Sequence, residues 1–359
     1  MNTQEKISGA QLFAALFVCR VVGLFTFTAP QEAGFSAGDR VAFLLPFLLL
    51  CLLCAIPSLL TARHKDGALG LAAEVSPGLA KAAAVLFCAA FVCAAALGTL
   101  RFERFTGDVM FPAGNTLLPT ALLLAAAGAA ALHGTQALGR ASVILLGLLT
   151  ASLAFILFST ARRFSWVNLT PPLESGAGPA LQNALYSLCR TPELAALALA
   201  PMFTKGSVPK TGLRWLTVFS LAAAVIFCCI GGVTGAYGER QAYPLYALTV
   251  VAEYGVFQRM DALLTGLWTL AALLRAAFFL RLAANALERG FGKPLPAPAI
   301  WAGAGITFGL FLAFSSLAAA TDGKAAVTAS GAVAALSAIT LPTVLLLARR
   351  IGGRKKNAQ

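Results

Sequence analysis

Long apolar stretches constrain the fold of this chain more than any other feature of its sequence. A helix needs about 20 apolar residues to cross hydrocarbon, and ten stretches of about that length follow one another. They span residues 8–28, 38–62, 80–100, 115–133, 138–161, 181–203, 213–236, 261–287, 297–319 and 326–348. Backbone groups in lipid must be satisfied within the protein. The sequence therefore predicts an all-α integral membrane protein, with residues 1–359 forming a single transmembrane, transporter-like domain.

The charges agree with a membrane protein in number and in placement. Only 11% of residues are charged, against roughly 25% in a soluble domain. The net charge of +13 does not indicate nucleic-acid binding, because the basic residues follow the positive-inside rule. With both termini in the cytoplasm, sixteen Lys and Arg lie inside, eight lie outside and three lie within spans. We expect the basic tail, residues 349–359, to contact anionic membrane lipid.

The ten predicted spans divide into two halves of five, residues 1–161 and 162–348. Because five is odd, the second half would enter the membrane with the opposite orientation. Inverted repeats of this kind are a hallmark of secondary transporters. The two halves show no visible sequence match, so this prediction rests on counting and on one shared feature: the first span of each half looks interrupted.

In span one Gly23 follows Arg20 closely, and in span six Pro192 removes a backbone donor. Irregular backbone at membrane depth is tolerated where it lines a cavity, so two interrupted spans at matching positions predict a solute site. Prolines also kink many membrane helices with no ligand nearby, and that alternative stays open. The candidate substrate-binding residues are Val22, Gly23, Leu24, Phe25, Ser187, Leu188, Cys189, Thr191 and Glu193.

The ionisable residues deepest in the spans are Arg20, Arg190, Glu193 and Arg275. Each costs at least about 2.5–3.5 kcal/mol at the centre of a membrane helix. Glu193 has two candidate partners, Arg190 three residues before it and Arg20 across the cavity. It would hold a ligand amine or take part in proton coupling, or the pair would only join spans one and six. Arg20 would lock the unwound segment or meet a carboxylate, and Arg275 would line an inner vestibule or pair with a neighbouring span.

The longest outer connection, Tyr237–Asp261, is apolar enough to lie in the interface. We expect it to fold into a short helix that acts as a lid, with Arg259 and Asp261 at the start of span eight. The connection between spans two and three predicts an amphipathic segment on the inner surface. The candidate coupling or gating residues are Arg20, Arg190, Glu193, Arg259, Asp261 and Arg275.

No grouping of catalytic residues stands out, and the sequence predicts no enzyme, metal site or cofactor. The two histidines, His64 and His133, lie in separate regions. All eight cysteines fall within predicted spans, where they act as small apolar side chains. No nucleotide-binding motif is present in the sequence, so ATP-driven pumping by this chain alone is excluded.

Three segments resemble the spore germination permease family, the B subunits of germinant receptors. The stretch "KISGAQLF" resembles the start of the family's first span, and "YSLCRTPELAALALAPMFTK" is similar to its sixth, with Glu193 as the matching glutamate. The stretch "AYPLYALTVVAEYGVFQRMDALLTGLW" is similar to the family's most recognisable motif. The residues that carry this motif are Tyr243, Pro244, Gly255, Phe257, Arg259, Asp261 and Trp268.

The resemblance implies the amino acid–polyamine–organocation permease fold, a LeuT-like 5+5 inverted repeat of ten helices with helices 1 and 6 discontinuous. It implies a small germinant, typically an amino acid, bound between spans one and six. Partners would be an A-type subunit and a lipoprotein C-type subunit in the inner membrane of the spore. The chain departs from the family at Arg20 and at Thr191-Pro192, where an aromatic residue after glycine is usual. The alternatives are a stand-alone proton- or cation-coupled permease and a non-binding scaffold or channel subunit.

Overall fold

The computed structural model describes residues 6–26, 37–112, 114–171, 173–174, 176–252, 261–321 and 324–356. Within these ranges the regular structure is helical, as predicted, and one isolated bridge joins Ile7 to Thr204. Seven helical segments are long and apolar enough to cross a membrane. They are Leu44–Thr61, Pro77–Met110, Gly134–Arg163, Val208–Gly235, Asp261–Phe291, Ala297–Thr321 and Ala325–Ile351.

The other three predicted spans contain shorter helices. Span one contains α1 (Gly9–Phe25), span four contains α6 (Leu117–Leu132), and span six is divided into α8 (Ala177–Cys189) and α9 (Glu193–Leu199). The seven long segments contain α3 (Leu44–Thr61), α5 (Pro77–Phe105), η1 (Thr106–Met110), α7 (Gly134–Thr160), η2 (Ala161–Arg163), α10 (Val208–Glu239), α12 (Asp261–Phe291), α13 (Ala297–Thr321), α14 (Lys324–Ala335), η5 (Leu336–Thr340) and α15 (Leu341–Lys356). The short elements between them are α2 (Ala37–Ala42), α4 (Gly67–Val75), η3 (Trp166–Leu169), η4 (Ala200–Met202) and α11 (Pro244–Val251).

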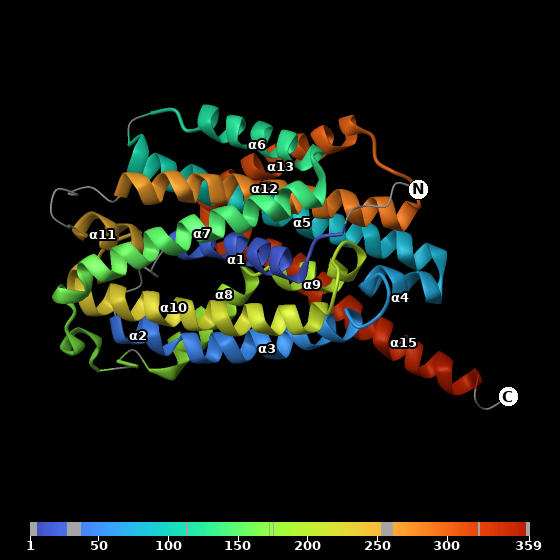
Figure 1. Ribbon diagram of the computed structural model, residues 1–359, viewed down its shortest axis with the longest axis horizontal. Coiled ribbons are helices and arrows are strands. Elements are labelled where there is room, and N and C mark those ends of the chain that lie inside the picture. The colour runs from blue at the N-terminus through green and yellow to red at the C-terminus, as the bar shows by residue number, and fades with distance from the viewer. Residues whose placement is uncertain are drawn as a thin grey trace.

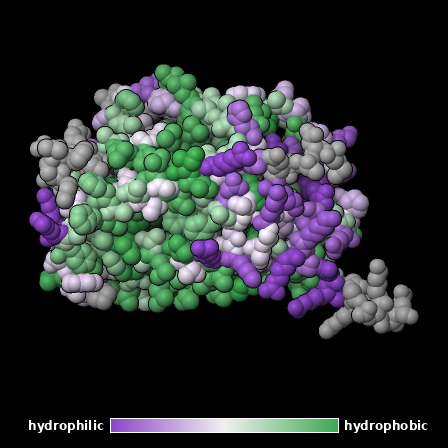
Figure 2. All heavy atoms as spheres, viewed as in Figure 1, coloured by the Kyte–Doolittle hydropathy of each residue, from purple (hydrophilic) through white to green (hydrophobic). Residues whose placement is uncertain are grey.

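The helices lie side by side along the long axis of the molecule, with α1 inside the bundle (Figure 1). α1 packs against α7, α10 and α12, and α12 packs along α5. The outer surface is apolar: Leu45, Leu122 and Ile144 are each at least 60% exposed. Apolar residues cover the middle of the face in Figure 2, and hydrophilic residues gather toward the end that holds α4 and α15. A surface of this kind is stable only against lipid, so the protein is a multi-pass membrane protein.

The break in span six is confirmed, but the expected break at Gly23 is wrong. α1 runs without interruption through Gly23 to Phe25, and Thr26 caps it by donating from both its backbone N–H and its hydroxyl to the Val22 carbonyl. A glycine costs a helix only about 1 kcal/mol and removes no hydrogen bond, so it does not end a helix by itself. Residues 27–36, the rest of this region, lie outside the described residues.

Two further predicted segments are helical. The connection between spans two and three contains α4. Asp66, the residue just before α4, forms an ion pair with Arg289. Gly67, which opens α4, has φ +61°, and a Cβ there would lie 2.1 Å from the carbonyl oxygen of Ala198. Only glycine allows this approach of α4 to α9.

The outer connection contains α11, as expected for a lid. The hydroxyl of Tyr243, just before α11, donates to Asp108 Oδ2 at 2.6 Å. Tyr243 and Tyr246 also pack edge-on against Phe105 of α5, with ring centroids 5.0 and 5.8 Å away. The ring of Phe105 in turn packs against that of Trp268 of α12, with 4.4 Å between the ring centroids. α11 and Tyr243 before it therefore pack on an aromatic cluster that Phe105 and Trp268 form with the two tyrosines; the role of this segment as a lid stays a prediction.

Candidate functional site

The backbone break between α8 and α9 has a local cause. Pro192 has no N–H, and the Leu194 N–H turns back to the Thr191 carbonyl at 3.3 Å, so it does not continue the helix to Arg190. The Leu188 carbonyl has no α-helical partner, because Pro192 lacks an N–H, and it accepts instead from the Thr191 N–H at 2.9 Å. The break also frees the carbonyl of Arg190.

Arg20 of α1 satisfies this freed carbonyl. Its Nη1 donates to the Arg190 oxygen at 2.9 Å, and the side chain is buried between the rings of Phe47 and Phe219. The first helix of the chain therefore faces the break in span six directly. This contact agrees with the first role expected for Arg20, that of a lock on the irregular segment. The expected Arg20–Glu193 pair is not formed among the described residues.

Glu193, the first residue of α9, pairs with Arg275 of α12. The Arg275 Nη2 to Glu193 Oε1 distance is 3.7 Å, and the two side chains are 4% and 0% exposed. Arg275 Nη1 also donates to the Cys19 carbonyl of α1 at 3.0 Å. The expectation that Arg275 pairs with a neighbouring span is thus confirmed, and this one side chain connects α12, α1 and α9. Arg190 does not pair with Glu193; its guanidinium lies over the ring of Tyr186, 4.1 Å from the centroid.

Arg101, just beyond the predicted end of span three, also lies at this site. α5 continues past that end, and Arg101 is half-buried on it. A Cβ built on Gly23 would lie 3.5 Å from Arg20 Nη1 and 3.9 Å from Arg101 Nη1, so the two guanidinium groups flank this glycine. Arg101 is also repelled by Arg190 and Arg275. The signal that could have found it is the run "RFER", whose first arginine is close enough to the span to face inward.

The site contains buried polar atoms without a hydrogen-bond partner. They are Nη2 of Arg101, Nε of Arg190, Nε of Arg275 and both carboxylate oxygens of Glu193. More than nine in ten buried polar groups in proteins find a partner, and a charged group left without one is especially costly. Their concentration around one backbone break makes this region the candidate site.

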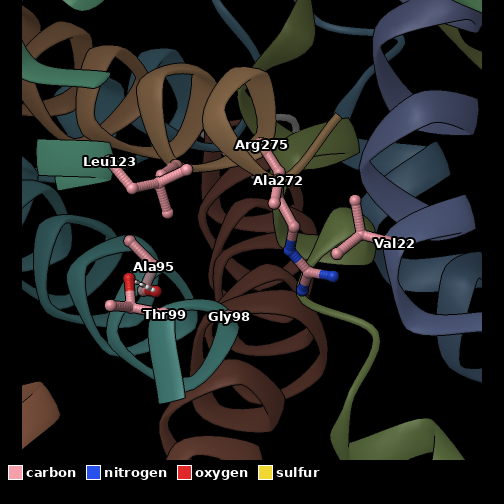
Figure 3. A pocket seen from close by; sticks show the side chains of 8 residues that line it. Val22, Ala95, Gly98, Thr99, Leu123, Ala272 and Arg275 are labelled. Carbon is pink, nitrogen blue, oxygen red and sulfur yellow. Dashed lines mark hydrogen bonds between the residues drawn. The ribbon is translucent and has the colours of Figure 1, made fainter. Parts of the chain in front are cut away.

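A cavity lies beside Arg275 (Figure 3). Arg275 points into it from α12, opposite the small residues Ala95, Gly98 and Thr99 of α5, and Val22 of α1 borders it. The volume of this cavity is about 10 Å³, enough for about one water molecule. A solute the size of an amino acid would fit here only if the surrounding helices separated.

The remaining candidate residues that the structure describes lie either at the break or near α11. Ser187 and Thr191 are buried at the break, where the Thr191 hydroxyl donates to the Ser187 carbonyl at 3.0 Å, and Leu24, Leu188 and Cys189 are half-buried. Asp261 is buried in the first turn of α12, 3.5 Å from the Tyr246 hydroxyl. A helix rise of about 1.5 Å per residue places Asp261 about 21 Å from Arg275, beneath the lid and not in the charged site. The Phe25 side chain, Gly255, Phe257 and Arg259 lie outside the described residues.

Replacing Arg20 with glutamine tests the lock. The freed Arg190 carbonyl would lose a hydrogen bond from a charged donor, a contribution of about 1.5–3 kcal/mol. We expect a lower thermal unfolding midpoint for Arg20→Gln in detergent and an unchanged one for Arg140→Gln, which changes an exposed arginine on α7. Equal midpoints for Arg20→Gln and the parent protein would show that Arg20 does not hold the break.

The model of a protein family described as spore germination protein matches residues 6–317. The chain belongs to this family. The match covers the helices that carry the charged site, from the start of α1 into α13, and confirms the resemblance drawn from the sequence.

Comparison with other proteins adds structures of low similarity. No curated protein matches the chain. Three crystal structures of a manganese transporter from Eremococcus coleocola are similar: one in complex with an aromatic bis-isothiourea substituted compound, and the mutants H236A and E129A. Their sequence identities are 13%, 14% and 13%, and their TM-scores are 0.49, 0.45 and 0.44. Each match covers 94% of this chain and 76%, 77% and 77% of the transporter chain.

Proposed function

We propose that this protein is the transporter-like B-type subunit of a germinant receptor. It binds an amino acid or a similar small solute at mid-membrane, between α1 and the break in span six, and signals spore germination. Its fold is the LeuT-like 5+5 inverted repeat of ten spans, with both termini in the cytoplasm. It works in the inner membrane of the spore with A-type and C-type receptor subunits. One observation carries the proposal: the irregular backbone at Arg190–Pro192 faces α1 inside the helix bundle, beside a buried ion pair.

The break supports a solute site because the hydrocarbon of a bilayer cannot satisfy the polar groups of irregular backbone. Non-helical backbone is stable at membrane depth only when it is buried in protein or lines a polar cavity. Secondary transporters bind their substrates at such discontinuous helices. In this chain the break also places Glu193, a fully buried carboxylate, at the start of a half-helix. Ionisable residues within membrane spans are costly and mark functional sites by default.

The contacts around the site provide a route for a signal. Arg275 binds both Glu193 and the α1 backbone, so a solute that draws Glu193 away changes how α12 holds α1 and α9. The start of α1 is joined to the segment after α9, because the Ile7 N–H donates to the Phe203 carbonyl and the Lys205 N–H to the Ile7 carbonyl. A movement at the site would therefore shift this joined end of the bundle as a unit.

Solute binding by the purified protein tests this proposal. Thermal unfolding would be followed in detergent with each amino acid and with a set of nucleosides and sugars. We expect at least one solute to raise the unfolding midpoint, because a ligand that binds only the folded state stabilises it. Absence of any shift while the protein is folded would contradict solute binding and favour a non-binding scaffold or channel subunit.

A proton- or cation-coupled permease is a second candidate, favoured by one observation. Both oxygens of Glu193 lack a hydrogen-bond donor, as expected for a carboxylate that exchanges a proton or meets a cation during transport. Uptake of a radiolabelled solute into proteoliposomes separates the two functions. Gradient-driven accumulation by this chain alone would favour the permease, and binding without accumulation would favour the sensor.

A further inference from the structure

We propose that the solute bound at this site is an anion with two carboxylates, and that an acidic amino acid fits it best. This inference rests on the proposed function and narrows the chemical class of its ligand. It is carried by the balance of charge at the break, by the donors that have no partner there, and by the position of Glu193.

The site holds more positive charge than the protein neutralises. Arg101 is repelled by Arg190, Arg275 and Arg20, while Glu193 is the acidic residue that attracts Arg20 and pairs with Arg275. Among the described residues, the buried arginines Arg20 and Arg275 interact with this carboxylate, while the half-buried Arg101 and Arg190 have no carboxylate among their main electrostatic neighbours. Arginine stays protonated in proteins, and an uncompensated charge away from water is strongly unfavourable. A negatively charged ligand would remove this excess.

The four arginines differ in how far their donors are occupied. Arg20 and Arg275 are committed to the backbone, each through one hydrogen bond to a carbonyl of the facing segment. Arg101 and Arg190 retain unpartnered buried nitrogens, Nη2 and Nε respectively, and Arg275 retains one at Nε. A guanidinium group binds a carboxylate through two parallel hydrogen bonds. Because Arg275 is already held by Glu193 and by the Cys19 carbonyl, Arg101 and Arg190 are the groups we assign to the ligand.

Gly23 marks the place where two of the arginines approach α1. The ideal Cβ position there is within 4 Å of both Arg20 Nη1 and Arg101 Nη1, at 3.5 and 3.9 Å. A Cβ would therefore be in ordinary van der Waals contact with both groups, so Arg20 and Arg101 lie against the same point of α1, beside the break that Arg20 contacts.

Among the residues that the structure describes around the break, Glu193 supplies the negative group, and neither of its oxygens has a hydrogen-bond donor. The ammonium group of an acidic amino acid would contact Glu193, and its two carboxylates would contact Arg101 and Arg190. A neutral zwitterion would leave the excess of positive charge unchanged, and a cationic solute would increase it. Inorganic anions supply negative charge but have no group for Glu193.

Binding of a small set of probes at constant ionic strength tests the charge of the ligand. The probes are L-glutamate, L-aspartate, glutarate, L-alanine, L-lysine and inorganic phosphate, measured by equilibrium binding to the full chain in detergent. We expect glutamate or aspartate to bind at least tenfold more tightly than alanine, and lysine not to bind. Preferential binding of alanine or lysine would overturn the inference and leave the proposed solute site standing. Binding of phosphate without either acidic amino acid would also overturn it. A failure of all these probes overturns the inference, and the wider solute panel then decides the proposed function separately.

Variants of the two arginines test their part in binding. Arg101→Gln and Arg190→Gln should each weaken glutamate binding at least tenfold. Because the neighbouring arginines repel Arg101, Arg101→Gln should not lower the thermal unfolding midpoint without ligand. The matched control, Arg140→Gln on the exposed face of α7, should bind glutamate like the parent. Parental glutamate affinity in both Arg101→Gln and Arg190→Gln would contradict their assignment as ligand-binding residues.

Discussion

Glu193→Gln should lower the free energy of unfolding by about 3–5 kcal/mol, the usual cost of removing one partner of a buried ion pair. Glu193 is fully buried, lies 3.7 Å from Arg275 and also attracts Arg20. Glutamine keeps the shape of the side chain and removes its charge, so the loss reports electrostatics and not packing. The thermal unfolding midpoint of the purified protein, measured without ligand, would show the effect.

The same variant should change which solute is bound. Glutamine does not attract an ammonium group, so glutamate binding should weaken at least tenfold while glutarate, which lacks the amine, should lose less. Removing the second partner as well, in Glu193→Gln/Arg275→Gln, should restore part of the lost stability, because no buried group of the pair is then left uncompensated. Glu74→Gln, at an exposed carboxylate, is the control. An unchanged midpoint and an unchanged glutamate affinity in Glu193→Gln would remove this residue from the site.

Trp268→Ala should be comparably destabilising, by about 3–5 kcal/mol, because truncation of a large buried side chain leaves a cavity. Trp268 is 0% exposed, and its ring lies between those of Phe102 and Phe105, with centroid distances of 5.5 and 4.4 Å. Phe105 also supports Tyr243 and Tyr246 of the lid. We therefore expect both a lower unfolding midpoint and faster limited proteolysis within the outer connection, Tyr237–Asp261.

Two controls separate the aromatic cluster from general effects of losing tryptophan. Trp268→Phe keeps a ring in the cluster and should cost much less. Trp301→Ala removes a tryptophan that is 43% exposed and lies on α13, so it should leave proteolysis of the lid unchanged. Cleavage of Trp268→Ala at the parental rate would contradict the role of this cluster in holding α11 closed.

The sequence predicted those features that local chemistry determines. Hydropathy located the helices, and Pro192 located the break in span six because a proline removes a hydrogen bond wherever it stands. The break predicted at Gly23 was wrong because a glycine permits a break in a helix but does not cause one. The lid helix followed from apolar residues in a connection too short to cross the membrane twice.

Contacts between distant segments could not be predicted from the sequence. Arg20 and the Arg190 carbonyl are 170 residues apart, and Arg275 and the Cys19 carbonyl are 256 residues apart. Depth in the membrane identified these arginines, but only the packing of α1, α9 and α12 assigned their partners. Arg101 was missed because its own charge ended the apolar stretch, although α5 continues past it and neighbouring helices bury it.

A structure of the full chain with bound L-glutamate tests the central claim most directly. We expect the ligand between α1 and the break at Arg190–Pro192, with its carboxylates on Arg101 and Arg190 and its ammonium on Glu193. The helices around the present cavity should have moved apart to admit it. A continuous helix through residues 186–199, or glutamate bound elsewhere in the bundle, would contradict the account.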